Sequence, residues 1–222
     1  MVEPHGGDLV DRIVADGEAG ELAARAAAMP RLTLDAREIA DLELIATGAA
    51  SPLVGFLGSA DYASVRDRLR LADGTVWPLP FTLAVYERMR HELEGAPQAA
   101  LADPAGRLWG LIDIDETYQR DPLREASAVY GTDDPSHPGV AYLLGRPSWL
   151  IGGAVRVLPL PEDLPFARYR LTPRALRGQI AERGWRRVAG FQTRNPIHRA
   201  HEHLTKVALE VTDGLVLHPL VG

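Results

Sequence analysis

The sequence contains no cysteine, so the chain can form no disulfide, no thiolate zinc site and no thiol nucleophile. No apolar run reaches the length of a transmembrane helix, and the acidic, polar start has no signal-peptide core. Aromatic residues make up 6% of the chain, and they form no platform interleaved with basic residues as in nucleic-acid-binding proteins. These absences predict a cytoplasmic protein that binds neither a membrane nor nucleic acid.

The 222 residues allow one large or two modest domains, and the net charge of −6 is divided unevenly between the two ends. Residues 1–167 carry 14 basic and 26 acidic side chains, a balance of −12. Residues 168–222 carry 10 basic and 4 acidic side chains, a balance of +6. The basic end suits an anionic small molecule. A solvated basic face is the competing explanation, and for Arg186 and Arg187 it is the better one.

Two domains are predicted, with a boundary near residue 168, just after prolines at 159, 161 and 165. Residues 1–167 show the pattern of short strands, many turns and few helices, which favours a compact β-rich barrel. Asp35 and Glu38 form a capping box that opens one of those helices. Strands are expected at 32–34, 76–85, 99–102, 108–114 and 149–158, and helices at 21–29, 39–45, 62–69 and 122–130.

The second domain contains the stretch around which the chain is organised, residues 186–218. Residues 188–191 are a short apolar run, long enough for a buried parallel strand. A polar turn follows, in which Asn195 suits an N-cap and Pro196 suits the first helical position. Apolar residues then recur at helical spacing until a second apolar run at 215–217, which is typical of the next strand. The stretch is therefore predicted to be one βαβ unit.

Side chains that suit an anion gather between the first strand and the helix. His198 and His201 are three residues apart, so both project from one side of the helix beside its N-terminus. Free backbone N–H groups and the helix dipole favour an anion there. Arg194 adds a fixed charge whose fork geometry suits sulfate or phosphate, and Gln192 and Asn195 add neutral donors. The combination predicts an oxyanion or polyphosphate site.

Two plainer interpretations of the histidine pair stay open, namely surface histidines and an accidental metal pair. A zinc site is disfavoured, because an HxxH pair without a neighbouring carboxylate or cysteine is a poor set of zinc ligands. The order HRAHE also differs from HExxH, so the metalloprotease motif is excluded.

Residues 192–202, QTRNPIHRAHE, closely resemble the signature of the ATP-sulfurylase (sulfate adenylyltransferase) family. Residues 47–56 resemble that family's GAFSPLxGF segment, with Ala50 where an aromatic residue is usual, and residues 137–140 resemble its HPGV turn. The resemblance implies a PUA-like domain over residues 1–167. Over residues 168–222 it implies the first part of a Rossmann-like nucleotidyltransferase α/β domain.

The resemblance also implies a reaction, in which ATP and sulfate give adenosine 5′-phosphosulfate and pyrophosphate as the first step of sulfate assimilation. Mg²⁺ would accompany ATP, coordinated by phosphate and water rather than by protein side chains. The complete protein is expected to be a homo-oligomer. By resemblance, Gln192 and Arg194 bind sulfate. ATP contacts are implied for Gln192, Thr193, Arg194, Asn195, His198 and His201, and the implied catalytic set is Thr193, Arg194, Asn195, His198 and His201.

Two other functions stay open, namely a different nucleotidyltransferase with the same histidine pair and a non-catalytic fragment that binds sulfate or phosphate. A parallel sheet of two strands cannot bury both of its faces. Residues 168–222 are therefore expected to need further residues, from this chain or another. The 222 residues alone are expected to be inactive.

Overall fold

The computed structural model describes residues 2–163 and 166–220. They form two compact units, one of Pro4–Arg170 and one of Leu171–Gly222 with Met1–Glu3. The division falls between Arg170 and Leu171. Among the described residues, none of the helices has both the length and the apolar character needed to cross a membrane.

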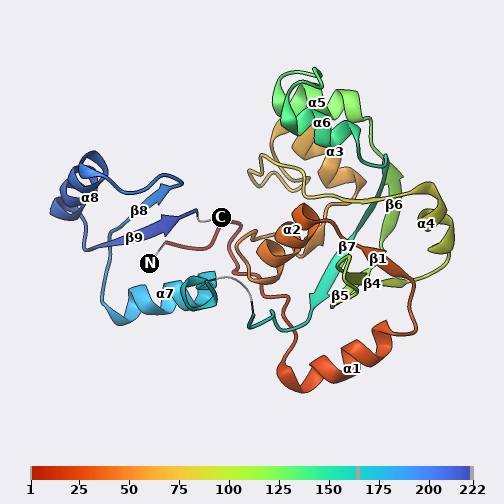
Figure 1. The fold of residues 1–222 in the computed structure, drawn as a ribbon, viewed down its shortest axis with the longest axis horizontal. Helices are drawn as coiled ribbons and strands as arrows, with labels where there is room; N and C mark the ends of the chain where they lie inside the picture. Colours follow the sequence, from red (N-terminus) through yellow and green to blue (C-terminus); the bar gives the residue numbers. More distant parts are fainter. Residues whose placement is uncertain (1, 164–165, 221–222) are drawn as a thin grey trace. The chain divides into compact units, whose positions relative to one another are not determined.

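The larger unit is built on a seven-stranded sheet that curls into a half-barrel (Figure 1). The long strand β7 is its centre, and it pairs antiparallel with β3 and β6 along its first half and with β2 and β5 along its second. From β5 the sheet continues through β4 to β1, which runs parallel to β4. The strands are β1 (Arg31–Thr33), β2 (Gly55–Phe56), β3 (Leu83–Val85), β4 (Gln98–Ala102), β5 (Leu108–Asp113), β6 (Glu116–Gln119) and β7 (Trp149–Val157).

The strand expected over residues 76–85 is an error of the sequence pattern, because only the last three of these residues form a strand. Pro78 and Pro80 have no N–H to donate to a sheet, so the ladder begins after them. The strand expected over 149–158 is confirmed, and it is the strand that organises the sheet.

The larger unit also holds more helix than the sequence pattern predicts. Its helices are α1 (Asp16–Ala26), α2 (Ala36–Ala46), α3 (Ser59–Arg68), α4 (Glu87–Glu92), α5 (Pro122–Tyr130) and α6 (Pro138–Leu144). The two shortest, α4 and α6, have at most two turns, too few for an apolar period to be visible. The residues that resemble an HPGV turn begin α6, with His137 as its N-cap. Figure 1 shows α3, α5 and α6 gathered at one end of the sheet.

One buried cluster joins the sheet to its helices. Leu42 and Ile45 of α2 belong to the same cluster as Ile151 and Val155 of β7, and none of these four side chains is exposed to solvent. The predicted capping box at the start of α2 is present, with Asp35 accepting from the backbone of Glu38 and Glu38 accepting from that of Asp35. Each aliphatic side chain buried in this way contributes about 1.5–3 kcal/mol, so the larger unit has a core of its own.

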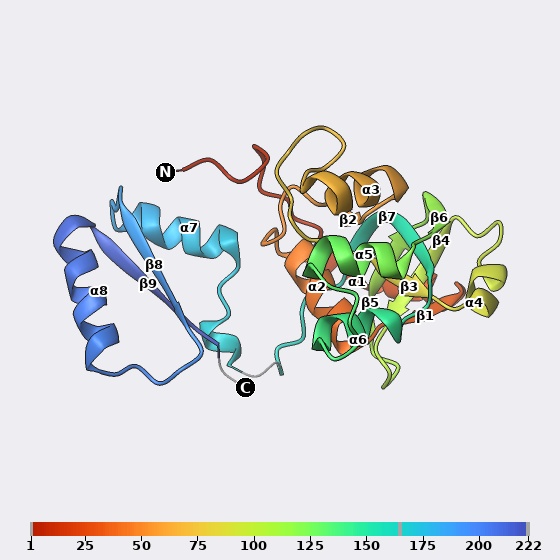
Figure 2. The same cartoon turned by 90° about the horizontal axis from the view of Figure 1, so that it is seen from above.

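The smaller unit is the predicted βαβ unit with one helix before it. Its elements are α7 (Pro173–Glu182), β8 (Val188–Thr193), α8 (Arg199–Val211) and β9 (Gly214–Pro219). β8 and β9 pair in parallel, from Val188 opposite Gly214 to Thr193 opposite Pro219. Figures 1 and 2 show α7 on one side of these two strands and α8 on the other. Among the described residues 166–220, no apolar side chain is buried.

Candidate active site

The carboxyl ends of β8 and β9 form the base of the candidate site. Gln192 lies opposite His218 in the sheet register, and the Gln192 Nε2 atom is 3.4 Å from His218 Nδ1. The Thr193 hydroxyl accepts from the Asn195 N–H and donates to the Asn195 carbonyl, each over 3.1 Å. The Leu220 N–H donates to the Thr193 carbonyl at 2.8 Å, so the chain after β9 stays beside the end of β8. The polar loop thus starts from a fixed edge.

Helix α8 begins later than the sequence pattern predicts. Its N-cap is His198, with extended backbone angles of φ −124° and ψ 177°, and its first residue is Arg199. The His198 Nδ1 atom accepts from the Ala200 N–H at 3.3 Å. Asn195 is therefore not the cap and Pro196 is not the first helical residue. The physical reason is competition, because the Thr193 hydroxyl already holds both backbone groups of Asn195.

The two signature histidines lie together at this helix start. The ring centroids of His198 and His201 are 4.0 Å apart, with 31° between the ring planes. Phe191 of β8 packs against the other histidine, with its ring centroid 5.5 Å from that of His201 and 58° between the planes. The His201 Nδ1 atom is buried and has no hydrogen-bond partner. Three rings from strand and helix therefore lie in a row at the start of α8.

Two carboxylates of this unit, Glu202 and Asp213, are engaged in local contacts. Glu202 binds Lys206 one turn along α8, with Nζ to Oε1 at 2.6 Å, and this lysine holds the pKa of the Glu202 carboxyl below its usual range. Asp213 accepts from the backbone N–H groups of Arg187 and Arg186, and these bonds lower its pKa. Over residues 2–163 and 166–220, no group of three or more histidine, aspartate or glutamate side chains is placed to hold a metal ion.

Comparison with known proteins finds a matching family model for each of the two units. Residues 2–160 match the model of the PUA-like domain, and residues 167–222 match that of ATP-sulfurylase. The chain is 52% identical over 222 residues to a sulfate adenylyltransferase of Symbiobacterium thermophilum, covering all of this chain and 56% of that protein. A probable bifunctional SAT/APS kinase 2 of Sorangium cellulosum is 46% identical over 222 residues, covering 100% of this chain and 38% of that protein.

The chain belongs to the PUA-like domain family over residues 2–160, and residues 167–222 are similar to ATP-sulfurylase. It spans about half the length of the curated sulfate adenylyltransferases that it matches. Among solved structures, a hexameric APS kinase from Thiobacillus denitrificans is similar with a TM-score of 0.76 and 33% identity, over 100% of this chain and 40% of that one. The similarity therefore includes both the PUA-like part and the part that carries the histidine pair.

The structure brings together some of the predicted site residues. His198 and His201 stack on each other, and Thr193 holds the backbone of Asn195. Arg194 lies exposed in the same loop. Phe191 received no site role from the sequence pattern, although an aromatic residue directly before the QTRN motif is the signal that could have indicated one.

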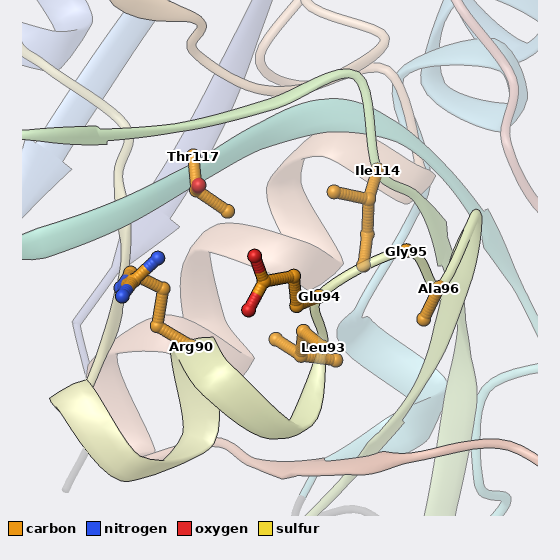
Figure 3. Close-up of a pocket in the computed structure, with 7 residues that line it drawn as sticks. All are labelled: Arg90, Leu93, Glu94, Gly95, Ala96, Ile114 and Thr117. Atoms are coloured by element: carbon orange, nitrogen blue, oxygen red, sulfur yellow. The ribbon is translucent and has the colours of Figure 1, made fainter.

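A cavity of about 260 Å³ belongs to the PUA-like unit and has a different character (Figure 3). Figure 3 shows Arg90, Glu94 and Thr117 around it, with Leu93 and Ile114 as apolar walls. The Arg90 guanidinium donates to Glu87 and lies 4.5 Å from the Trp149 ring centroid. Its charge is thus already balanced within the unit. None of the signature residues lines this cavity.

Proposed function

We propose that the protein carrying this chain is a sulfate adenylyltransferase, which converts ATP and sulfate into adenosine 5′-phosphosulfate and pyrophosphate. The observation that carries the proposal is the position of the QTRNPIHRAHE signature. It starts at the end of parallel strand β8 and finishes in the first turn of α8, with His198 and His201 stacked at 4.0 Å. The carboxyl ends of parallel strands and the N-terminus of a helix are both sites where proteins bind phosphate groups.

The proposed roles follow the positions of the side chains. Gln192 and Arg194 bind sulfate, because an amide N–H and a guanidinium are both donors that suit an oxyanion. The six residues Gln192, Thr193, Arg194, Asn195, His198 and His201 contact ATP. Of these, Thr193, Arg194, Asn195, His198 and His201 form the catalytic set. Thr193 contributes by fixing the Asn195 backbone, so that the loop keeps one shape.

The chemical step needs alignment and charge stabilisation and no covalent enzyme group. A sulfate oxygen attacks the α-phosphorus of ATP, and a sulfur–oxygen–phosphorus bridge forms. The bond from the α-phosphorus to the oxygen that links it to the β-phosphorus breaks, and pyrophosphate leaves with that oxygen and the electron pair. Sulfate is a weak nucleophile, so holding it in line with the α-phosphorus accounts for much of the acceleration. Arg194 and the histidine N–H groups stabilise the charge that develops on the phosphate oxygens.

Mg²⁺ enters this proposal with ATP, because the loop carries amide, guanidinium and imidazole groups but no carboxylate for a hard cation. We further propose that the smaller unit is the first part of a Rossmann-like nucleotidyltransferase domain, since β8, α8 and β9 form a parallel βαβ unit. We also propose that the complete protein is a homo-oligomer and that it works in the cytoplasm, where ATP is available. The hexameric relative from Thiobacillus denitrificans supports the oligomer.

Arg194→Ala tests the proposed function in the protein that carries this chain at full length. Arg194 supplies the fixed charge of the loop between β8 and α8, here called the anion loop. Its loss should therefore lower sulfate-dependent exchange between ATP and pyrophosphate by roughly 10²-fold or more. Arg186→Ala removes the same charge from the start of β8 and should leave the exchange unchanged. Circular dichroism checks that both variants fold.

Three outcomes decide between the candidate functions. Exchange that needs sulfate and falls with Arg194→Ala supports sulfate adenylyl transfer. Exchange that runs equally well without sulfate would point to another nucleotidyltransferase that uses the same histidine pair. Sulfate binding in the full-length protein without any exchange would mean a non-catalytic anion-binding protein.

A further inference from the structure

A row of three rings is formed by Phe191, His201 and His198. The two histidines in it differ in whether the Nδ1 atom has a hydrogen-bond partner. In His198, Nδ1 accepts from the Ala200 N–H at 3.3 Å. In His201, Nδ1 is buried and has no hydrogen-bond partner, while Phe191 packs at 5.5 Å against the same ring. The partners of the two ring nitrogens indicate which nitrogen of a histidine carries the proton.

Each environment favours one tautomer of the neutral imidazole. A nitrogen that accepts an N–H must carry its lone pair, so the proton of neutral His198 sits on Nε2. A buried N–H without an acceptor is rarer in proteins than a buried lone pair, so His201 also keeps its proton on Nε2.

We propose that Phe191 is a positioning residue for the anion site: its ring covers the Nδ1 side of His201, so that His198 and His201 both present Nε2–H donors to one oxyanion. The inference deepens the proposed function, because it states how the histidine pair recognises phosphate. Phe191 itself contacts no ligand in this scheme. It acts through the orientation and tautomer of His201.

The position of Phe191 on β8 suits a positioning role, because the strand holds the ring in place. The strand is paired with β9 along its whole length, with Phe191 opposite Leu217, so the aromatic ring is carried by a regular ladder rather than by the loop. His201 lies in the first turn of α8, and Phe191 is the ring of β8 that meets it. An aromatic contact of this kind favours one ring orientation over another.

The test uses the 222-residue chain, with inorganic tripolyphosphate as the probe. Phe191→Leu removes the ring and keeps an apolar side chain, while Leu217→Ala, at the paired position of β9, is the matched control. Nitrogen-15 NMR of the histidine rings reports each tautomer without any need for turnover. Calorimetry with tripolyphosphate reports affinity. Phe191→Tyr restores a ring and is the rescue variant.

We expect Phe191→Leu to give His201 a mixture of both tautomers and to weaken tripolyphosphate binding by about tenfold, the effect of one weakened charge-assisted hydrogen bond. Leu217→Ala should change neither reading, and Phe191→Tyr should restore both. Unchanged tautomers in Phe191→Leu would overturn the proposal, whatever the affinity. If the full-length protein bound no tripolyphosphate yet the tautomers responded as expected, the ring arrangement would stand and the proposed function would fail.

Discussion

At the scale of single residues, His198 serves two purposes that substitutions can separate. Its ring caps α8 through Nδ1, and in our proposal its Nε2–H faces the phosphates. Asparagine is a good N-cap without an imidazole, whereas alanine neither caps nor donates. His198→Asn should therefore keep the helix start and lose the anion contact. His198→Ala should lose both.

Two measurements on the 222-residue chain check this separation. Tripolyphosphate affinity should fall about tenfold in both variants, as expected when one hydrogen bond to a charged group is lost. Exchange of the Ala200 amide should quicken in His198→Ala alone, by a factor that corresponds to about 0.5–2 kcal/mol of cap stability. His137→Asn is the control, because His137 caps α6 through Nδ1 in the same way, at 3.2 Å from the Gly139 N–H. Parent-like affinity in His198→Asn would show that the ring is not needed.

The sequence predicts residue-level features well where one local interaction decides them. The Asp35–Glu38 capping box is present, because it needs only residues three positions apart. The prediction that Asn195 is the N-cap of α8 is wrong for the opposite reason. Its backbone had two possible partners, the helix and the Thr193 hydroxyl, and a pattern of residue types does not rank them.

At the scale of elements, helix α2 contains a carboxyl group, that of Asp41, whose surroundings raise its pKa. Burial, with the nearby charges of Glu38 and Asp35, raises the pKa of Asp41 to about 6. Glu38 itself is buried, which raises its pKa, although it accepts hydrogen bonds from the Asp35 and Ala84 N–H groups and from Arg146. Asp41 and Glu38 therefore both ionise at a cost to folding, and among the described residues no hydrogen bond offsets that cost at Asp41.

Asp41→Asn should stabilise the folded protein at neutral pH. Because the folded pKa lies above the ordinary value of 3.8, Asp41 favours folding fully below that value, and this stability is lost as pH rises through about 6. Asparagine never ionises, so the variant should exceed the parent by roughly 1–3 kcal/mol at pH 7–8 and equal it near pH 3.5. Urea unfolding across this pH range measures the difference, with exposed Asp8→Asn as control. A variant with the parent's pH dependence would refute the role of Asp41.

Elements follow from sequence when they are long enough to show a period. Helix α5 is confirmed over Pro122–Tyr130, and β7 over Trp149–Val157. Helices α4 and α6 have six and seven residues, too few to show a period, and in α6 burial from tertiary packing fixes the helix instead. In α6, Val140 and Leu143 are buried against Ala126 of α5, a contact that no local pattern contains.

At the scale of the whole molecule, the sequence separates a β-rich part from a βαβ part, and the structure has both. What the sequence pattern cannot supply is closure of the sheet, because strand pairing depends on contacts far apart in the chain. Glycines at the centre of β7 illustrate this dependence. A Cβ at Gly152 would lie 2.6 Å from the Gly58 backbone, so the close approach of these segments requires glycine, yet Gly152 alone does not reveal its partner.

The two units also differ in how much apolar surface they bury, and hydrogen exchange should reveal it. Leu111, Ile112, Leu150 and Ile151 of β5 and β7 have no exposed surface, so their amides should exchange only through global unfolding. On α8, by contrast, Leu204 is 58% exposed and Val211 is 63% exposed. Amides of β8, α8 and β9 are therefore expected to exchange through local opening.

The expected difference is at least about 100-fold in exchange rate, or about 2.8 kcal/mol of local stability, in the 222-residue chain. Mass spectrometry of peptides from β5, β7, β8 and α8 measures it directly. Tripolyphosphate should slow exchange around the first turn of α8 and leave β5 and β7 unchanged, because a ligand stabilises the state that binds it. Equal protection of β7 and β8 in the free chain would contradict the picture. It would mean that residues 171–220 bury apolar surface that the exposed side chains of α8 do not show, and that the anion loop already stands on a complete core.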